Sequence, residues 1–189
     1  VLPAVCAIIY NDSGLLAISL SILICLVASV PLTSMPPKNK TMYSKEGFIT
    51  VALSWIVMSI FGALPFYISK HIPSFVDALF ETVSGFTTTG ATILTDVESM
   101  SKSMLFWRSF THWIGGMGII VLSIAILPIF GLNGMQLYAA EVSGLTYEKV
   151  SPRISDTAKM MWSIYVLLTA TEVAALWLCG MDVFDAVCH

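Results

Sequence analysis

The sequence predicts an all-α membrane protein, from its composition and from the distribution of its charges. Of the 189 residues, 57% are hydrophobic and only 11% are charged, whereas a soluble domain carries about 25% charged residues. The charges are too few to cover a soluble domain, and the net charge of −3 offers no basic face to nucleic acid. The composition therefore argues against a soluble enzyme, a nucleic-acid-binding protein and a disordered chain.

Four runs with one charge or none predict membrane-spanning helices. A hydrocarbon core of about 30 Å needs about 20 helical residues, and each run is at least that long. The fourth run contains a single acid, Glu172. The runs cover residues 13–37, 47–69, 109–140 and 160–181. The shorter apolar stretch 1–11 is interpreted as the end of a helix whose start is missing, and it lacks the features of a signal peptide.

One uncharged run, residues 82–95, is too short to cross the membrane, because it would reach only about 21 Å as a helix. It contains Gly85, Gly90 and three successive threonines. Non-helical backbone at membrane depth is tolerated only inside protein or beside water. We therefore expect a re-entrant segment, preceded by a short helix with Ser74 as its N-cap and Asp77 in its first turn.

Basic residues indicate the orientation, because cytoplasmic loops carry an excess of Lys and Arg. Two segments are basic, and the region around the threonines is acidic. The threonine-rich region is thus predicted to face outward. The basic residues are Lys38, Lys40 and Lys45 in the first segment, and Lys149, Arg153 and Lys159 in the second.

The stretch 84–92, SGFTTTGAT, has the composition of an ion filter. A dehydrated monovalent cation needs oxygen ligands, and backbone carbonyls supply them without a full charge that would trap the ion. Glycine permits the backbone dihedrals that such a loop requires, and the C-terminus of a short helix adds a favourable partial charge. Composition alone leaves a simple Thr/Gly loop at the membrane surface as the alternative.

Several motifs resemble the Trk-type potassium uptake family, in order and over nearly the whole chain. The segment ALFETVSGFTTTGAT at 78–92 resembles the first pore loop of that family. The segment LFWRSFTHWIGGMGIIVL at 105–122, followed by AILP at 125–128, continues the resemblance. So do GMQLY at 134–138 with AE at 140–141, and PRI at 152–154 with TAK at 157–159.

The resemblance implies a fold of four membrane helix–pore loop–membrane helix repeats around one pore, often preceded by two extra helices. On this map, residues 1–46 hold the extra helices, the first one truncated, and a cytoplasmic loop. Residues 47–130 form the first repeat, with the outer helix at 47–69, the pore helix at 75–85, the filter at 87–91 and the inner helix at 102–130. Residues 131–156 form a cytoplasmic linker, and residues 157–189 begin the second repeat.

An internal repeat points to the same organisation. The residues FVDA at 75–78 match VFDA at 183–186, and both follow an apolar span. A second pore helix would therefore start near Val183, and its filter would lie just past His189.

Single residues are also candidates for binding the ion or for modulating the pore and its gating. Arg108 would tune the pore field, although snorkelling or pairing with Glu81 or Asp96 remains the alternative. Gly116 would be a flexible point for gating, or else a packing site. Glu172 is a candidate modulator of the pore or its gating, because it is an acid inside a predicted membrane span. The filter is predicted at Thr87, Thr88, Thr89, Gly90 and Ala91, with potassium held at Thr88, Thr89 and Gly90.

Potassium uptake across a bacterial or archaeal cytoplasmic membrane, by a multi-pass subunit, is the predicted function. A symporter that couples potassium to protons or sodium through the same pore is the alternative. Potassium is the expected ion, with modest selectivity over sodium, and no organic cofactor is expected in this chain. Membrane lipid is an expected partner, and the resemblance implies two more: a second copy of the full-length subunit and a cytoplasmic regulatory subunit that binds NAD or ATP. No HExxH or GxSxG motif and no paired catalytic acids are present, so an enzyme is not predicted.

Overall fold

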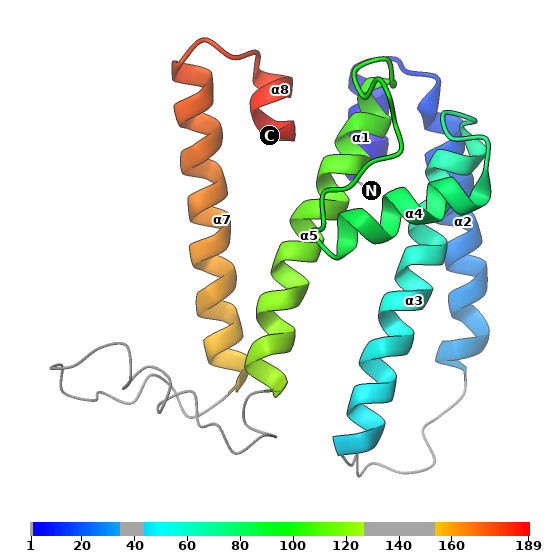
Figure 1. Cartoon of the computed structure of the whole chain (residues 1–189), viewed down its shortest axis with the longest axis vertical. Coiled ribbons are helices and arrows are strands. Elements are labelled where there is room, and N and C mark those ends of the chain that lie inside the picture. Colours follow the sequence, from blue (N-terminus) through cyan, green and yellow to red (C-terminus); the bar gives the residue numbers. More distant parts are fainter. Residues whose placement is uncertain (1, 35–43, 127–153) are drawn as a thin grey trace, which may run out of the picture. The chain divides into compact units, whose positions relative to one another are not determined.

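The computed structural model describes residues 2–34, 44–126 and 154–189, and all the regular elements in these ranges are helices (Figure 1). The predicted all-α class is confirmed. Most of the predicted linker and the predicted end of the inner helix, residues 127–130, lie outside the described residues. The helices are α1 (Leu2–Ile9), α2 (Gly14–Thr33), α3 (Ser44–Ile68), α4 (Phe75–Phe86), α5 (Lys102–Ile126), α7 (Ile154–Leu178) and α8 (Val183–Cys188).

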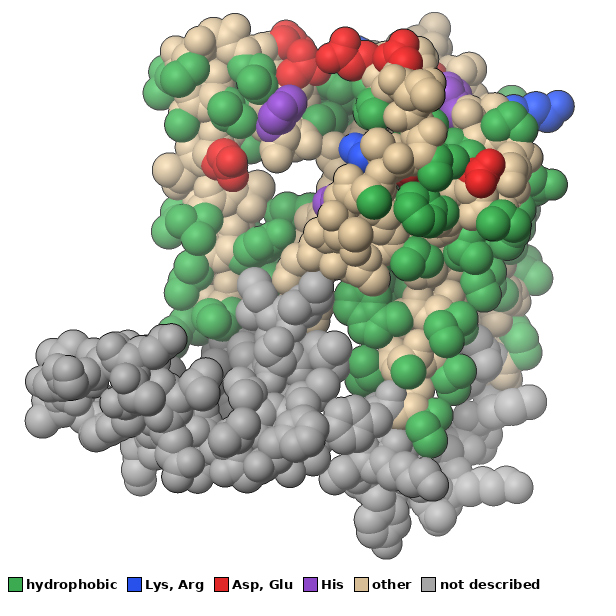
Figure 2. Space-filling model, in the orientation of Figure 1, with side chains coloured by type: hydrophobic (Ala, Val, Ile, Leu, Met, Phe, Trp, Pro, Cys, Tyr) green, Lys and Arg blue, Asp and Glu red, His purple; other side chains and the backbone are tan. Residues whose placement is uncertain are grey.

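Three helices in the described part of the chain are long and apolar enough to cross a membrane. The segments are Gly14–Pro31 in α2, Ile49–Ile68 in α3 and Lys159–Leu178 in α7, and they fall in three of the four predicted spans. α5 lies in the region of the remaining span and has 25 residues, the same length as α3 and α7. Hydrophobic side chains cover the visible faces of α2 and α3 (Figure 2), as expected for surfaces in lipid.

Residues Val1–Gly115 form one compact unit, in which α1 packs on α2, α2 on α3 and α3 on α4. α4 begins where the sequence predicts, because the Ser74 side chain accepts a hydrogen bond from the backbone N–H of Asp77 at 3.4 Å. One buried cluster joins all five helices of this unit and the loops beside them. Its members are Ala7, Ile18, Ala63, Phe66, Ile72, Ala78, Met100 and Met104.

Residues Gly116–His189 form the second unit, in which α8 packs on α7. Gly180 follows the end of α7 with a φ of 96°, a conformation that only glycine adopts easily. The Asp182 side chain then accepts a hydrogen bond from Phe184 N at 3.2 Å and caps α8. α8 starts at Val183, where the internal repeat places a second pore helix, and that pore role stays a prediction.

Asp12, in the turn between α1 and α2, caps α5 from 91 residues away. One carboxylate oxygen accepts bonds from the backbone N–H and the hydroxyl of Ser103, both at 2.9 Å. The other accepts a bond from Gly14 N at 3.1 Å. The first N–H groups of a helix have no partner within the helix, and the helix dipole favours an anion there. Asp12 therefore ties the N-terminal helices to the start of α5.

We expect the D12N variant to unfold at a lower temperature than the wild type. Burial raises the pKa of Asp12, but the hydrogen bonds from Ser103 and Gly14 outweigh it, so the pKa lies below its usual value. A lowered folded-state pKa gives stability that is present above the unfolded pKa and lost as the pH falls through the folded one. An amide would turn its N–H2 group toward these donors and cost about 1–2 kcal/mol at neutral pH.

The measurement is the thermal midpoint of the full-length subunit in detergent, at neutral pH and near pH 4. The gap between D12N and the wild type should narrow at the lower pH. D96N is the matched control, because Asp96 is exposed and its side chain caps only its own loop. An equal midpoint for D12N and the wild type at neutral pH would show that the cap contributes nothing.

Candidate functional site

The candidate filter begins where α4 ends, and the backbone turns sharply there. The N–H groups of Thr87, Thr88 and Thr89 donate to carbonyls in the last turn of α4 at 2.9–3.0 Å. Thr88 has a φ of 56° and Gly90 a φ of 76°, both left-handed. For threonine this conformation costs about 1–2 kcal/mol, and such strain is concentrated at functional sites. The loop thus starts at the partially negative end of the α4 dipole.

Three successive carbonyls in this loop are unoccupied by protein donors. Within the described residues, no hydrogen bond reaches the carbonyl oxygens of Thr88, Thr89 or Gly90, and all three residues are exposed. In a normal strand, successive carbonyls point to opposite sides. A left-handed φ at Thr88 and Gly90, but not at Thr89, breaks this alternation and allows successive carbonyls to point to the same side of the loop. The carbonyls on either side are occupied: Thr88 Oγ1 donates to Thr87 O at 2.7 Å, and Ser84 Oγ donates to Ala91 O at 2.5 Å.

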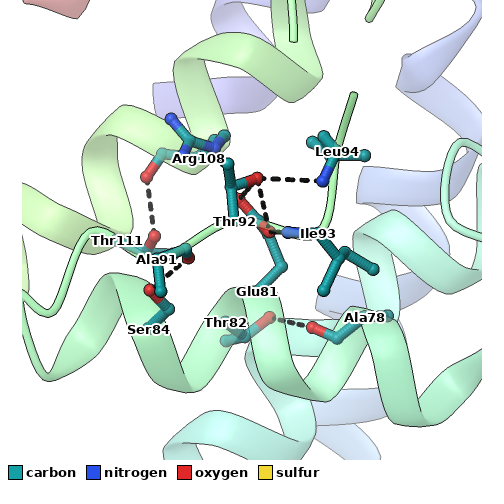
Figure 3. A network of polar contacts seen from close by, with 10 residues as sticks. All are labelled: Ala78, Glu81, Thr82, Ser84, Ala91, Thr92, Ile93, Leu94, Arg108 and Thr111. Atoms are coloured by element: carbon teal, nitrogen blue, oxygen red, sulfur yellow. Dashed lines mark hydrogen bonds and ion pairs between the residues drawn. The ribbon is translucent and has the colours of Figure 1, made fainter. Parts of the chain in front are cut away.

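The non-helical segment after Gly90, residues 91–94 and called the strand below, runs back along α4 and is fastened to it by two side chains (Figure 3). Glu81 and Ser84 are three residues apart and so share one face of the helix. Ser84 binds the strand at Ala91, and Glu81 binds it one residue further on. The Thr92 hydroxyl lies 2.9 Å and 3.0 Å from the two carboxylate oxygens of Glu81, and Ile93 N donates to one of them at 3.2 Å.

Glu81 is also half of an ion pair that connects α4 with α5. Arg108 Nε lies 2.7 Å from Glu81 Oε1. Glu81 is 2% exposed, and the Arg108 side chain is 20% exposed. Burying a carboxylate is costly unless it is paired and hydrogen-bonded, and Glu81 has both kinds of partner. One buried carboxylate therefore holds α4, the strand and α5 together.

Glycines allow the neighbouring helices to approach the end of α4. A Cβ atom on Gly115 of α5 would collide with Phe86 O and lie 2.7 Å from Phe86 C. A Cβ on Gly62 of α3 would lie 2.8 Å from Thr82 Cγ2 and from Phe86 Cε2. The Trp107 indole of α5 donates to Gly62 O at 3.0 Å. The last residue of α4 before the loop is therefore held between α3 and α5.

The structure brings together most, but not all, of the residues singled out by the sequence. The five filter residues and Arg108 lie in the first unit, where Arg108 pairs with Glu81. Gly116 and Glu172 belong to the second unit, where a Cβ on Gly116 would lie 2.7 Å from the Tyr165 hydroxyl and Glu172 is exposed. Their roles as modulators stay predictions.

Sequence reasoning missed the hydroxyl of Ser84, the central position of Glu81 and the cap by Asp12. Glu81 and Ser84 are three residues apart on a short helix, and this spacing already indicated that both side chains lie on one face. Asp12 gave no local signal, because its partner is 91 residues away.

Comparison with known proteins places this site in a family. A model of the TrkH family, described as "Cation transport protein", matches residues 16–189. The Trk system potassium uptake protein TrkH of Escherichia coli K12 is 46% identical over 192 residues, covering 100% of this chain and 40% of that protein. The TrkG protein of the same organism is 38% identical over 99% of the chain.

A solved structure agrees with these sequence matches. The crystal structure of the potassium transporter TrkH from Vibrio parahaemolyticus superposes with a TM-score of 0.83 at 37% identity, covering 100% of this chain and 37% of that one. The chain thus spans about 40% of the length of the relatives it matches. The family model covers more than half of the chain, and the site described above lies inside the matched residues. The chain belongs to the TrkH family of cation transport proteins.

Proposed function

We propose that this chain supplies one filter strand to a potassium uptake protein, with Thr88, Thr89 and Gly90 as the central backbone ligands. The observation that supports this most strongly is a set of three carbonyls, on exposed residues shortly after the C-terminal end of α4, that accept no hydrogen bond within the described part of the chain. Carbonyl oxygens can replace the hydration shell of a monovalent cation. Thr87 and Ala91, also predicted as ligands, bracket this set.

Local electrostatics support a cation at this place. The C-terminus of a helix carries about half a negative charge, and α4 ends at Phe86, directly before the loop. The carboxylate of Glu81, in contrast, is engaged by Arg108, Thr92 and Ile93. An ion would therefore meet dipoles and not a full charge, which favours passage over trapping.

Replacing Gly90 with serine in a full-length subunit that carries this segment should lower the selectivity for potassium over sodium. A Cβ on Gly90 would meet nothing within 4 Å, so the effect would come from the backbone and not from a clash. An L-residue at a φ of 76° costs about 1–2 kcal/mol, and the loop would relax away from that conformation. The measurement is tracer uptake of rubidium and sodium in bacteria that lack their own potassium uptake systems.

G180S is the matched control, because Gly180 also has a positive φ and open space around its Cβ position, but lies outside the filter. It should reduce stability slightly and leave selectivity unchanged. If G90S transported both ions with wild-type selectivity, the filter assignment would be wrong.

The remaining parts of the proposal rest on the family alone. The full-length subunit would pair as a homodimer in the cytoplasmic membrane and associate with a cytoplasmic regulatory subunit that binds NAD or ATP. Coupling of potassium to protons or sodium would use the same pore. Reversal potentials measured in liposomes at two pH values distinguish a simple potassium channel from a proton-coupled transporter. The reversal potential of a simple potassium channel does not shift with pH at a fixed potassium gradient.

A further inference from the structure

We propose that Ser84 sets the outer limit of the filter by holding the Ala91 carbonyl against the pore helix, away from the ion. This inference rests on the proposed function, because it presupposes that the carbonyls of Thr88, Thr89 and Gly90 bind the ion. It adds a side chain that sets how tightly the outer end of the filter holds the ion and that itself does not touch the ion.

The first step of the argument is the geometry of the bond. Ser84 Oγ donates to Ala91 O at 2.5 Å, at the short end of the range for hydroxyl–carbonyl bonds. Ser84 is 4% exposed and lies on α4, so its hydroxyl is fixed in direction by a packed helix. The sticks in Figure 3 show the Ala91 oxygen directed at Ser84.

The second step is the contrast between neighbouring carbonyls. Those of Thr88, Thr89 and Gly90 accept no hydrogen bond in the described part of the chain, whereas the next one along is occupied. Gly90 is also the last residue of this loop with a left-handed φ. A carbonyl that accepts a bond from behind the strand cannot at the same time turn its oxygen to the opposite side. The ligand set therefore stops at Gly90.

The third step is what a further ligand would change. Conduction requires an ion to bind tightly enough to enter and weakly enough to leave. A fourth carbonyl from the same strand would strengthen binding at the outer end. By withholding the oxygen of Ala91, Ser84 keeps the outer site weak and release fast.

The test is the S84A variant of the full-length subunit, assayed by rubidium uptake over a range of external concentrations. Loss of the hydroxyl leaves the Ala91 carbonyl without its donor and available to the ion. The apparent KM should fall by about two- to tenfold, the worth of one hydrogen bond, and the maximal rate should fall with it. S84T keeps a hydroxyl at this position and should behave like the wild type.

The matched control is S59A. Ser59 is also a buried serine whose hydroxyl bonds a backbone carbonyl, that of Trp55 at 2.8 Å, but it lies on α3. S59A should leave KM unchanged. If KM rises in S84A and discrimination against sodium is lost, Ser84 only braces the strand and the inference is wrong. An unchanged KM in S84A, or an equal effect in S84T, would also overturn it.

The failure of this inference can be told apart from the failure of the proposed function. If G90S loses selectivity while S84A is unaltered, the filter assignment stands and the role of Ser84 falls. If neither variant changes transport, the filter assignment itself has failed.

Discussion

Replacement of Glu81 by alanine is expected to abolish potassium uptake by a full-length subunit that carries this segment. The substitution leaves Arg108 without its partner and removes the acceptor for Thr92 and Ile93. Removing one member of a buried ion pair costs about 3–5 kcal/mol, because an uncompensated charge stays behind. The strand after Gly90 would also lose its attachment to α4 beyond Ala91. The measurement is rubidium uptake, normalised to the amount of subunit in the membrane.

A second variant separates the charge effect from the loss of the strand bonds. If most of the damage comes from the unpaired cation, the double variant E81Q/R108Q should be more stable in detergent than E81Q alone. Its uptake should stay low, because a Gln at position 81 presents both a donor and an acceptor to the strand. Equal thermal midpoints for the single and double variants would contradict the ion-pair argument.

D77N provides the control for Glu81. Asp77 is an acid on the same helix, but it is exposed in the first turn and has no ion-pair partner among the described residues. The substitution should cost well under 1 kcal/mol, through a weaker interaction with the helix dipole. Uptake by D77N at the wild-type level, beside loss in E81A, would assign the effect to the buried network.

Replacement of Gly115 by valine is expected to be as damaging as the loss of Glu81, for a steric reason. A Cβ at this position would collide with Phe86 O and lie 2.7 Å from Phe86 C and 2.9 Å from Gly85 O. These are backbone atoms, so no side-chain rotation can relieve the contact. Overpacking typically costs about 1–3 kcal/mol. Here it would also displace the residue that directly precedes the filter loop, so uptake should be lost even where the protein still folds.

G116A tests whether packing or flexibility matters in this glycine-rich stretch. Its new methyl group would meet the Tyr165 hydroxyl, which is the far end of a side chain and can move. We expect uptake to be largely kept in G116A and lost in G115V. Equal loss in both variants would instead favour a flexible gating point, since replacing either glycine stiffens the helix.

The fold could be predicted largely from the sequence, because long uncharged runs report burial in lipid directly. The helical regions around residues 13–37, 47–69 and 160–181 and the short helix before the filter were recognisable in this way. The start of α4 was also predictable, because an N-cap is a local interaction between residues three apart, here Ser74 and Asp77.

The polar contacts behind the filter were much less accessible to sequence reasoning. Pairing of Arg108 with Glu81 or Asp96 was only one alternative beside snorkelling and tuning of the pore field, and the tertiary structure selects Glu81. The occupied carbonyl of Ala91 depends on backbone dihedrals at Thr88 and Gly90 that composition does not specify. Such contacts depend on tertiary structure, and they determine which backbone carbonyls of the loop accept a hydrogen bond from the protein.

The cap that Asp12 places on α5 has a consequence for biosynthesis. Its two partners in Ser103 leave the ribosome 91 residues after Asp12, a delay of roughly 5 to 20 s at usual rates of translation. During that time only local donors such as Gly14 N are available to the carboxylate, and the oxygen that later meets Ser103 is solvated. Contacts between residues far apart in sequence form late, because their loop-closure entropy must be overcome first. The turn between α1 and α2 thus acquires its contact with α5 only after the start of that helix has been synthesised.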